Sequence, residues 1–197
     1  MRDLLARLRG MLFRISQTGR GSRICIGRGL RLYCKLEICG AGRVRLGDDC
    51  VVAGIPGDNR HYVTLYTHSP DAEISIGARA RLYAGRISSS HGISIGDDLL
   101  MEESGIMDTD FHAITPDRGP PQERPEQCRV RIGDRVSIGA RSIIAKGVSV
   151  GDDVSIYPGS IVTRNIPAGL TIAGNPAKPL RVGAEPESQP RQRRAAT

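Results

Sequence analysis

The chain has 197 residues, of which 39% are hydrophobic and 25% charged, proportions typical of a folded domain. Only 4% are aromatic and none is Trp, whereas 24 are Gly. The scarcity of aromatic rings excludes a sheet that binds RNA by stacking bases on exposed rings. It favours a narrow interior filled by aliphatic side chains.

The formal net charge is +7, but the basic residues gather near the two ends and the middle alternates in sign. This distribution favours solvated basic ends on a nearly neutral body, and no nucleic-acid partner is expected. Five Cys without a C-x-x-C pair indicate a reduced compartment. Arg residues interrupt the first apolar segment, so no signal peptide is predicted and the expected location is the cytoplasm.

Residues 1–21 are predicted to contain a short amphipathic helix. Its apolar residues share one helical face: Leu4, Leu5, Leu8, Met11, Leu12 and Ile15. The favoured interpretation is a helix that packs this face across the open end of the fold as a cap. The alternative is peripheral contact with an anionic membrane, at the inner membrane face.

From Ile132 to Ala173 the sequence consists of seven consecutive six-residue units: IGDRVS, IGARSI, IAKGVS, VGDDVS, IYPGSI, VTRNIP and AGLTIA. The first position is aliphatic in every unit. A helix needs a period near 3.6 and a single strand a period of 2, so a period of six predicts a short extended run followed by a turn. Three runs close a triangular coil, and coils stack about 4.8 Å apart. The first position is expected to point inward.

The upstream half repeats this pattern with interruptions. IGRGLR at Ile26, LGDDCV at Leu46, IGARAR at Ile76 and IGDDLL at Ile95 mark successive coils. The wider spacing between Leu46 and Ile76 predicts a loop within residues 55–71.

Three segments complete the predicted organisation. The repeat domain spans residues 22–181 and is interrupted by an extruded loop at 115–131, which contains four Pro. An insertion of this length in a compact repeat indicates a functional loop. Residues 182–197 are polar and are predicted to form a disordered tail.

His112 is the candidate catalytic residue. It follows Asp108 and Asp110 in the segment MDTDFH, just before the Pro-rich loop. A carboxylate can orient an imidazole, so this pattern fits a general base, although it also fits an exposed His in a polar loop. No Ser or Cys stands in a context that predicts a covalent nucleophile.

No metal site is predicted. The chain has four His, and His91 and His112 are spaced too loosely to define a ligand set. Four cationic residues near the last coils could hold phosphate groups or be ordinary surface charges: Lys146, Arg164, Lys178 and Arg181.

The hexapeptide run, the segment SIVTRNIPAGLTIAGNPAKPLR and the upstream DTDFH together resemble the hexapeptide-repeat acyltransferases. The resemblance covers roughly residues 46–181 and is strongest to the maltose, galactoside and lipopolysaccharide or capsule O-acetyltransferases. It implies an all-β fold, a left-handed parallel β-helix. It also implies a homotrimer that binds acetyl-CoA between neighbouring helices.

The same resemblance assigns roles to single residues. His112 takes the place of the catalytic His, with Asp108 and Asp110 as its acidic neighbours. The positions implied to contact CoA are Ala140, through its backbone amide, Pro158, Thr163, Arg164, Lys178 and Arg181. Two positions depart from the family: Pro158 is usually Ala, and Ser137 stands where relatives often have Trp.

The expected function is acetyl-CoA-dependent O-acetylation of a sugar hydroxyl in the synthesis of cell-envelope polysaccharide or glycolipid. The acceptor would be a saccharide and the cosubstrate acetyl-CoA, with no metal. Two alternatives stay open: N-acetylation of an amino sugar linked to a nucleotide, and a non-catalytic β-helix scaffold.

Overall fold

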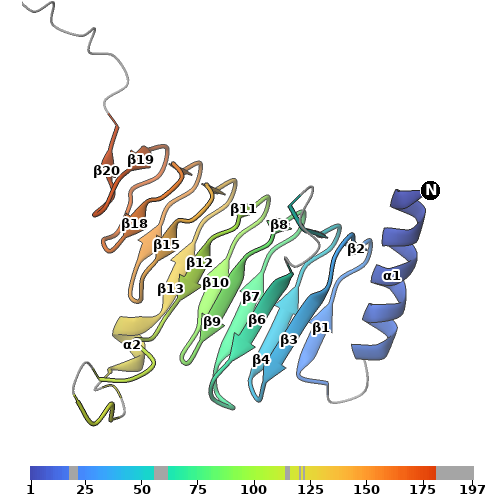
Figure 1. Cartoon of the computed structure of the whole chain (residues 1–197), viewed down its shortest axis with the longest axis horizontal. Helices are drawn as coiled ribbons and strands as arrows, with labels where there is room; N and C mark the ends of the chain where they lie inside the picture. Colours follow the sequence, from blue (N-terminus) through green and yellow to red (C-terminus); the bar gives the residue numbers. More distant parts are fainter. Residues whose placement is uncertain (18–21, 56–61, 114–115, 120, 122, 181–197) are drawn as a thin grey trace, which may run out of the picture.

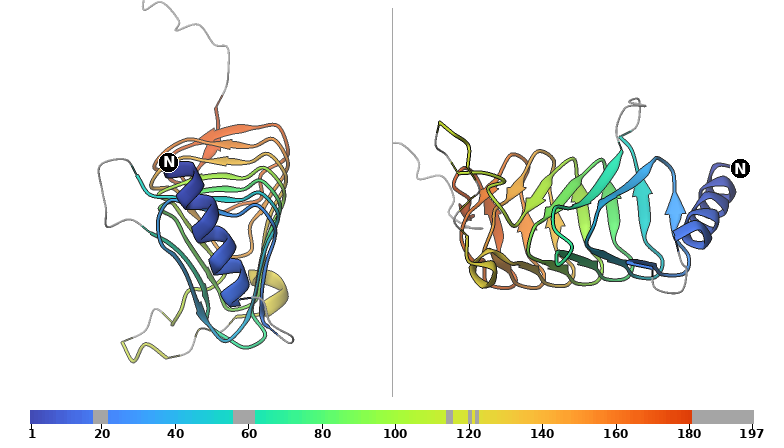
Figure 2. Two further views of the ribbon diagram at one scale, coloured as in Figure 1. Left: turned by 90° about the vertical axis from the view of Figure 1, so that its right-hand side faces the viewer. Right: turned by 90° about the horizontal axis from the view of Figure 1, so that it is seen from below.

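A computed structural model describes residues 1–17, 22–55, 62–113, 116–119, 121 and 123–180. An N-terminal helix, α1 (Arg2–Gln17), lies across one end of an elongated three-sided prism of parallel strands (Figures 1 and 2). A second, short helix, α2 (Pro125–Cys128), lies just before strand β13. The predicted all-β class and left-handed parallel β-helix are confirmed.

Each side of the prism is one sheet, built from one strand of each coil. Sheet A consists of β1 (Ile24–Ile26), β4 (Arg43–Leu46), β7 (Glu73–Ile76), β10 (Ile93–Ile95), β13 (Val130–Ile132) and β16 (Ser149–Val150). Sheet B consists of β2 (Arg31–Leu32), β5 (Val51–Ala53), β8 (Arg81–Tyr83), β11 (Leu100–Glu102), β14 (Ser137–Ile138), β17 (Ser155–Ile156), β19 (Thr171–Ala173) and β20 (Lys178–Pro179). Sheet C consists of β3 (Leu36–Gly40), β6 (Val63–Thr67), β9 (Arg86–Ser89), β12 (Gly105–Met107), β15 (Ile143–Ile144) and β18 (Ile161–Val162).

The predicted coil starts are aligned in register along sheet A. Ile26 pairs with Leu46, Leu46 with Ile76, Ile76 with Ile95, and Ile95 with Ile132. The four marker motifs therefore identify the stacked coils correctly, although the residues between them vary in number. The extra residues leave the prism at its corners, because only there can the chain loop out without breaking a strand ladder.

The first position of the repeat points inward, as predicted, in six of the seven units. The fifth position is buried as well, so each coil has two inward residues on every side, such as Val136 and Ile138. The interior is aliphatic because six inward side chains per coil leave no room for large rings.

The reading of seven unbroken units is wrong at the last one. Ile166 pairs with Val150, and Ile172 pairs with Ile156, so the final coil is two residues shorter than the coils before it. Ala168, at the first position of the seventh unit, is therefore exposed.

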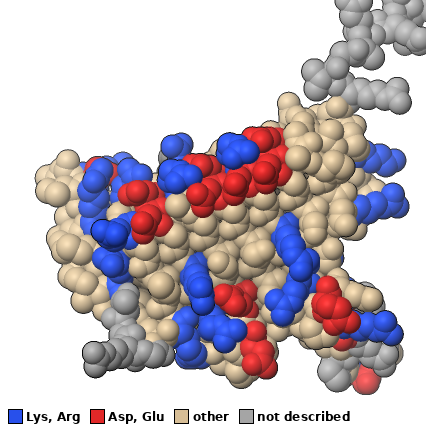
Figure 3. All heavy atoms as spheres, turned by 180° about the vertical axis from the view of Figure 1, so that it is seen from behind, with Lys and Arg blue, Asp and Glu red and all other residues tan. Residues whose placement is uncertain are grey.

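Acidic side chains line the corner between sheets A and B. The Asp134 carboxylate accepts a hydrogen bond from the Asp97 amide at 2.8 Å, and Asp152 accepts one from the Asp134 amide at 2.9 Å. Each Gly-Asp turn thus joins one coil to the next, and Figure 3 shows the resulting acidic row with Arg side chains beside it. The Arg135 guanidinium, for example, donates two hydrogen bonds to the Asp153 carboxylate, at 2.7 and 2.8 Å.

Helix α1 covers the first coil, as predicted, but with the face opposite to the predicted one. Its buried residues are Ala6 and Gly10. A Cβ atom added to Gly10 would lie 1.8 Å from the Leu30 carbonyl oxygen, so only Gly permits this close approach. The apolar residues of the predicted face are exposed instead. The backbone edge of the first coil thus selects small residues at this face of the helix.

Two insertions flank sheet C, one at each edge. The chain between β5 and β6 leaves at the corner of sheets B and C, and residues 56–61 within it lie outside the described residues. Of the range 55–71, within which a loop was predicted, Val63–Thr67 form strand β6.

The second insertion, here called the excursion, spans residues 108–129 at the corner of sheets C and A. The predicted loop, 115–131, starts and ends too far along the chain. The chain already leaves the prism after Met107, and Val130 already belongs to β13. The predicted tail 182–197 lies outside the described residues. None of the described helices has the length and hydrophobicity of a membrane-crossing segment.

Candidate active site

His112 lies in the excursion, just beyond the end of strand β12. The backbone turns sharply in front of it: the His112 amide donates to the Asp110 carbonyl at 2.8 Å, and Phe111 between them has a φ of +65°. This three-residue turn is strained for a bulky residue such as Phe. Backbone strain of this kind is concentrated at functional sites.

The His112 imidazole is held by the backbone. Its Nδ1 atom lies 2.9 Å from the carbonyl oxygen of Ala113. A carbonyl oxygen can only accept, so Nδ1 carries a proton, and in the neutral ring Nε2 has the lone pair. Nε2 is therefore the atom that can take a proton from a substrate.

Asp108 does not orient His112, contrary to the sequence-based expectation. Its side chain is fully buried and accepts four hydrogen bonds from the preceding corner of the prism. The donors are the Ser89 hydroxyl (2.7 Å) and the backbone amides of Ser90 (2.6 Å), His91 (3.0 Å) and Gly92 (2.5 Å). Asp108 thus holds the point from which the excursion departs.

Asp110 does not contact the His112 ring either. Its exposed carboxylate pairs with Lys146, which follows β15 on the next coil. Lys146 also donates to Glu123 Oε1 at 2.9 Å. Of the two acidic candidates, one is a structural acceptor and the other forms part of an ion-pair network that fixes the excursion.

Glu123 is the centre of this network. Its Oε1 accepts from the Asp110 amide at 2.9 Å, and its Oε2 accepts from the Thr109 hydroxyl at 3.0 Å and from His91 Nε2 at 3.1 Å. Burial alone would raise the pKa of the carboxyl, but the Asp110 amide, Lys146 and His91 together lower the pKa to about 2. Glu123 therefore clamps the excursion as an ion. No local sequence pattern indicates Glu123, because its partners are 13 to 32 residues away along the chain.

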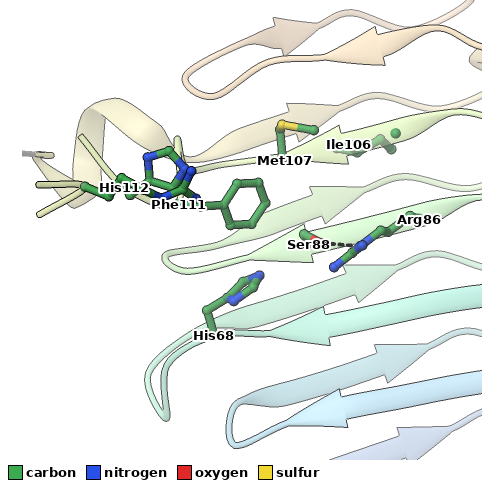
Figure 4. A pocket seen from close by; sticks show the side chains of 9 residues that line it. His68, Arg86, Ser88, Ile106, Met107, Phe111 and His112 are labelled. Atoms are coloured by element: carbon green, nitrogen blue, oxygen red, sulfur yellow. Dashed lines mark hydrogen bonds between the residues drawn. The ribbon is translucent and has the colours of Figure 1, made fainter. Parts of the chain in front are cut away.

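The excursion and sheet C enclose a pocket of about 410 Å³. Figure 4 shows its lining, which includes His68, Arg86, Ser88, Met107, Phe111 and His112. Met107 and Phe111 supply apolar surface and His112 supplies an imidazole. His68 and Arg86 were not predicted as site residues. His68 follows the end of β6, whereas Arg86 begins β9 and pairs with Gly105 at the start of β12.

The charged side of this pocket is cationic. The Arg86 Nε donates to the Ser88 hydroxyl at 3.2 Å, and no carboxylate lines the pocket among the described residues. His68 packs edge-on against Phe111, with 5.0 Å between ring centroids. Burial, and then the nearby Arg86 charge, lowers the pKa of His68, which is therefore neutral at pH 7.

The residues implied to contact CoA lie at two different edges of sheet C. Ala140 and Pro158 lie at the corner of sheets B and C, where the Gly159 amide donates to the Ala140 carbonyl at 2.8 Å. Thr163 and Arg164 follow β18, at the corner of sheets C and A. The first pair is therefore separated from His112 by the width of the sheet.

Lys178 is exposed on β20, the antiparallel strand at the edge of sheet B, and Arg181 lies outside the described residues. Within one chain, the structure brings Thr163 and Arg164 to the same corner as His112 but does not bring Ala140, Pro158 or Lys178 there.

One trio of potential metal ligands was not predicted. The ligand atoms of His91, Glu123 and Cys128 lie within 4.8 Å of one another. However, both Glu123 oxygens already accept hydrogen bonds, and burial followed by the Glu123 charge raises the pKa of the Cys128 thiol. We therefore interpret these three side chains as part of the contacts that anchor the excursion, and not as a metal site.

Comparison with known proteins agrees with the repeat. Residues 129–164 match the family model described as bacterial transferase hexapeptide (six repeats). A variant of AntD, an N-acyltransferase from Bacillus cereus in complex with dTDP and coenzyme A, is 18% identical with a TM-score of 0.61, over 82% of this chain and 84% of that chain. A galactoside acetyltransferase in complex with coenzyme A is 20% identical with a TM-score of 0.46, over 89% of this chain and 80% of that chain.

The acetyltransferase domain of PglB from Neisseria gonorrhoeae is 16% identical with a TM-score of 0.49. The match covers 77% of this chain and 57% of that chain, so this chain spans little more than half of the PglB structure. At these identities the likeness to AntD shows a shared fold.

Proposed function

Since this chain is a hexapeptide-repeat protein with a left-handed β-helix, we propose that it is an acetyl-CoA-dependent acetyltransferase with His112 as general base. The observation that carries the proposal is the His112 ring, whose Nδ1 is held by a backbone carbonyl and whose Nε2 is left with a lone pair beside a pocket. A scaffold needs neither a fixed tautomer nor a strained turn in front of it.

The reaction is a direct transfer. An acceptor hydroxyl or amine in the pocket donates its proton to Nε2 of His112 as its oxygen or nitrogen attacks the thioester carbonyl. The carbonyl oxygen becomes negative and is stabilised by a backbone amide, the role proposed for Ala140. Collapse breaks the carbon–sulfur bond, and the His112 imidazolium returns the proton to the leaving CoA thiolate.

The working site is proposed to form between two chains of a homotrimer. His112, Thr163 and Arg164 lie at one edge of sheet C, while Ala140 and Pro158 lie at the other. A site that uses both groups needs a second copy whose corner of sheets B and C faces the excursion of the first. A cyclic assembly satisfies this for every chain at once.

The proposed acceptor is a sugar hydroxyl in the cytoplasmic synthesis of cell-envelope polysaccharide or glycolipid. One observation favours the second candidate, N-acylation of an amino sugar linked to a nucleotide. Arg86 brings a guanidinium group into a pocket that, among the described residues, no carboxylate lines, which suits an acceptor that carries phosphate. The structurally similar AntD is an N-acyltransferase in complex with dTDP.

The test measures thiol release from acetyl-CoA with neutral sugar alcohols, sugar phosphates and nucleotide-linked amino sugars as acceptors. Transfer to hydroxyls supports O-acetylation, and transfer to amines supports the alternative. A native protein that binds acetyl-CoA must be stabilised by it. If a high acetyl-CoA concentration caused no thermal shift and no thiol were released, the non-catalytic β-helix scaffold would be the remaining interpretation.

A further inference from the structure

Helix α1 turns an apolar stripe toward solvent. Seven of the twelve large hydrophobic side chains that are exposed in the described part of the chain lie within residues 1–15. Leu4 is 71% exposed, Leu12 55% and Ile15 64%. An apolar stripe of this size on a surface indicates an interaction site.

The contacts of the opposite face fix this orientation. Ala6 and Gly10 lie against the first coil, and the Tyr33 hydroxyl donates to Asp3 at 2.5 Å. Arg14 Nε donates to the Ile26 carbonyl at 3.1 Å. Turning the leucines inward would break these hydrogen bonds and force side chains against the Leu30 backbone, so the stripe stays outward.

Basic residues border the stripe on both sides. With 100° between successive residues of a helix, Arg2 and Arg9 fall along one border, and Arg7 and Arg14 along the other. The helix contains four Arg and one Asp. An apolar stripe between two rows of cations is the pattern of a helix that lies in the surface of an anionic bilayer.

The position of α1 leaves the stripe accessible to a flat surface. The helix lies across the end of the prism, and the coils are all on one side of it (Figure 2). Figure 3 shows Lys and Arg side chains at this end of the molecule, with others along the same face and at the opposite end.

We infer that α1 docks this protein on an anionic lipid membrane. The leucine stripe enters the boundary between headgroups and acyl chains, and Arg2 and Arg9, which border it on one side, contact lipid phosphates. The prism then stands with its first coil toward the membrane. This inference is independent of the proposed reaction, because it uses no residue of the pocket.

The absence of Trp from the sequence gives a specific probe. In the full chain, the Leu8→Trp variant carries a single Trp on the stripe, and Leu180→Trp carries one on an exposed site beyond the last coil. With vesicles of phosphatidylcholine containing about 30% phosphatidylglycerol, we expect the emission of Leu8→Trp to shift to the blue and that of Leu180→Trp to stay unchanged. Pure phosphatidylcholine vesicles and high salt should weaken the shift.

A second variant measures binding without a probe. In the triple variant Leu4→Gln, Leu8→Gln, Leu12→Gln, we expect at least tenfold weaker co-sedimentation with the anionic vesicles, with an unchanged circular dichroism spectrum. Equal binding of the triple variant and the unmodified protein, or no binding by either, would overturn the inference. So would a smaller oligomer in the triple variant by light scattering, which would assign the stripe to contact between copies of the chain.

Discussion

The Nδ1 atom of His112 lies 2.9 Å from the carbonyl oxygen of Ala113, the next residue in the chain. The proposed base is thus oriented by its own backbone, and neither Asp108 nor Asp110 is needed to fix its tautomer. The shape of the excursion therefore decides where Nε2 points. Residues that hold the excursion should affect activity without touching the acceptor.

Asp108→Ala should act on stability. The change leaves the amides of Ser90, His91 and Gly92 without their buried acceptor, and each unsatisfied group costs about 1–3 kcal/mol. We expect the free energy of unfolding, measured in urea, to fall by about 3 kcal/mol or more. Asp108→Asn, which keeps one acceptor oxygen, should lose less. If Asp108→Ala instead had normal stability and a very low kcat, Asp108 would be a residue that orients the His112 imidazole.

Glu123 should make the fold sensitive to acid. Its pKa is about 2 in the folded chain, against 4.5 for an ordinary Glu carboxyl. The proton therefore binds more tightly to the unfolded chain, so the stabilisation is complete above pH 4.5 and is lost as the pH falls toward 2. Urea titrations across this range should show a steeper loss for the unmodified protein than for Glu123→Gln. Identical pH profiles would contradict the clamp.

Glu123→Gln should also reduce turnover at pH 7. The Gln side chain can still accept hydrogen bonds, but it loses the charge that pairs with Lys146. Lys146 is one-third exposed and keeps Asp110 as a partner, so the lost charge should loosen the excursion without unfolding the chain. We expect kcat to fall while the binding of acetyl-CoA, measured by calorimetry, changes little, because the proposed CoA contacts lie outside the excursion. An unchanged kcat would show that the clamp does not position His112.

A mixing experiment tests the site between chains. His112→Ala removes the proposed base, and Ala140→Pro removes the proposed backbone donor. If each site uses His112 of one chain and Ala140 of another, trimers assembled from equal amounts of the two inactive variants should regain about a quarter of the unmodified activity. A site contained in one chain predicts no recovery. Light scattering should first show that both variants form the same oligomer.

The sequence predicted the coils well because burial in a β-helix follows a strict period. Ile26, Leu46, Ile76 and Ile95 are in register, as their motifs indicated. The two-residue shortening of the last coil was missed, because Ala168 fits the period as well as Ile166 does. The period records which residue types recur and does not record how many residues a turn needs.

The excursion and the helix were predicted less well for a different reason. His112 was singled out from its local sequence, but its anchor depends on Glu123 and Lys146, whose contacts cross many residues. For α1, helical periodicity identified the apolar face correctly. It could not show that the first coil selects the small residues Ala6 and Gly10 and leaves the leucines outside.

The most direct test of the proposed function is the rate of thiol release from acetyl-CoA by the unmodified protein and by His112→Ala, with the best acceptor of the panel. We predict a loss of at least 100-fold in kcat, the range of a removed general base, with acetyl-CoA binding by calorimetry preserved. His112→Gln, which keeps a polar side chain of similar length, should be equally impaired. Near-normal turnover by either variant would contradict the account.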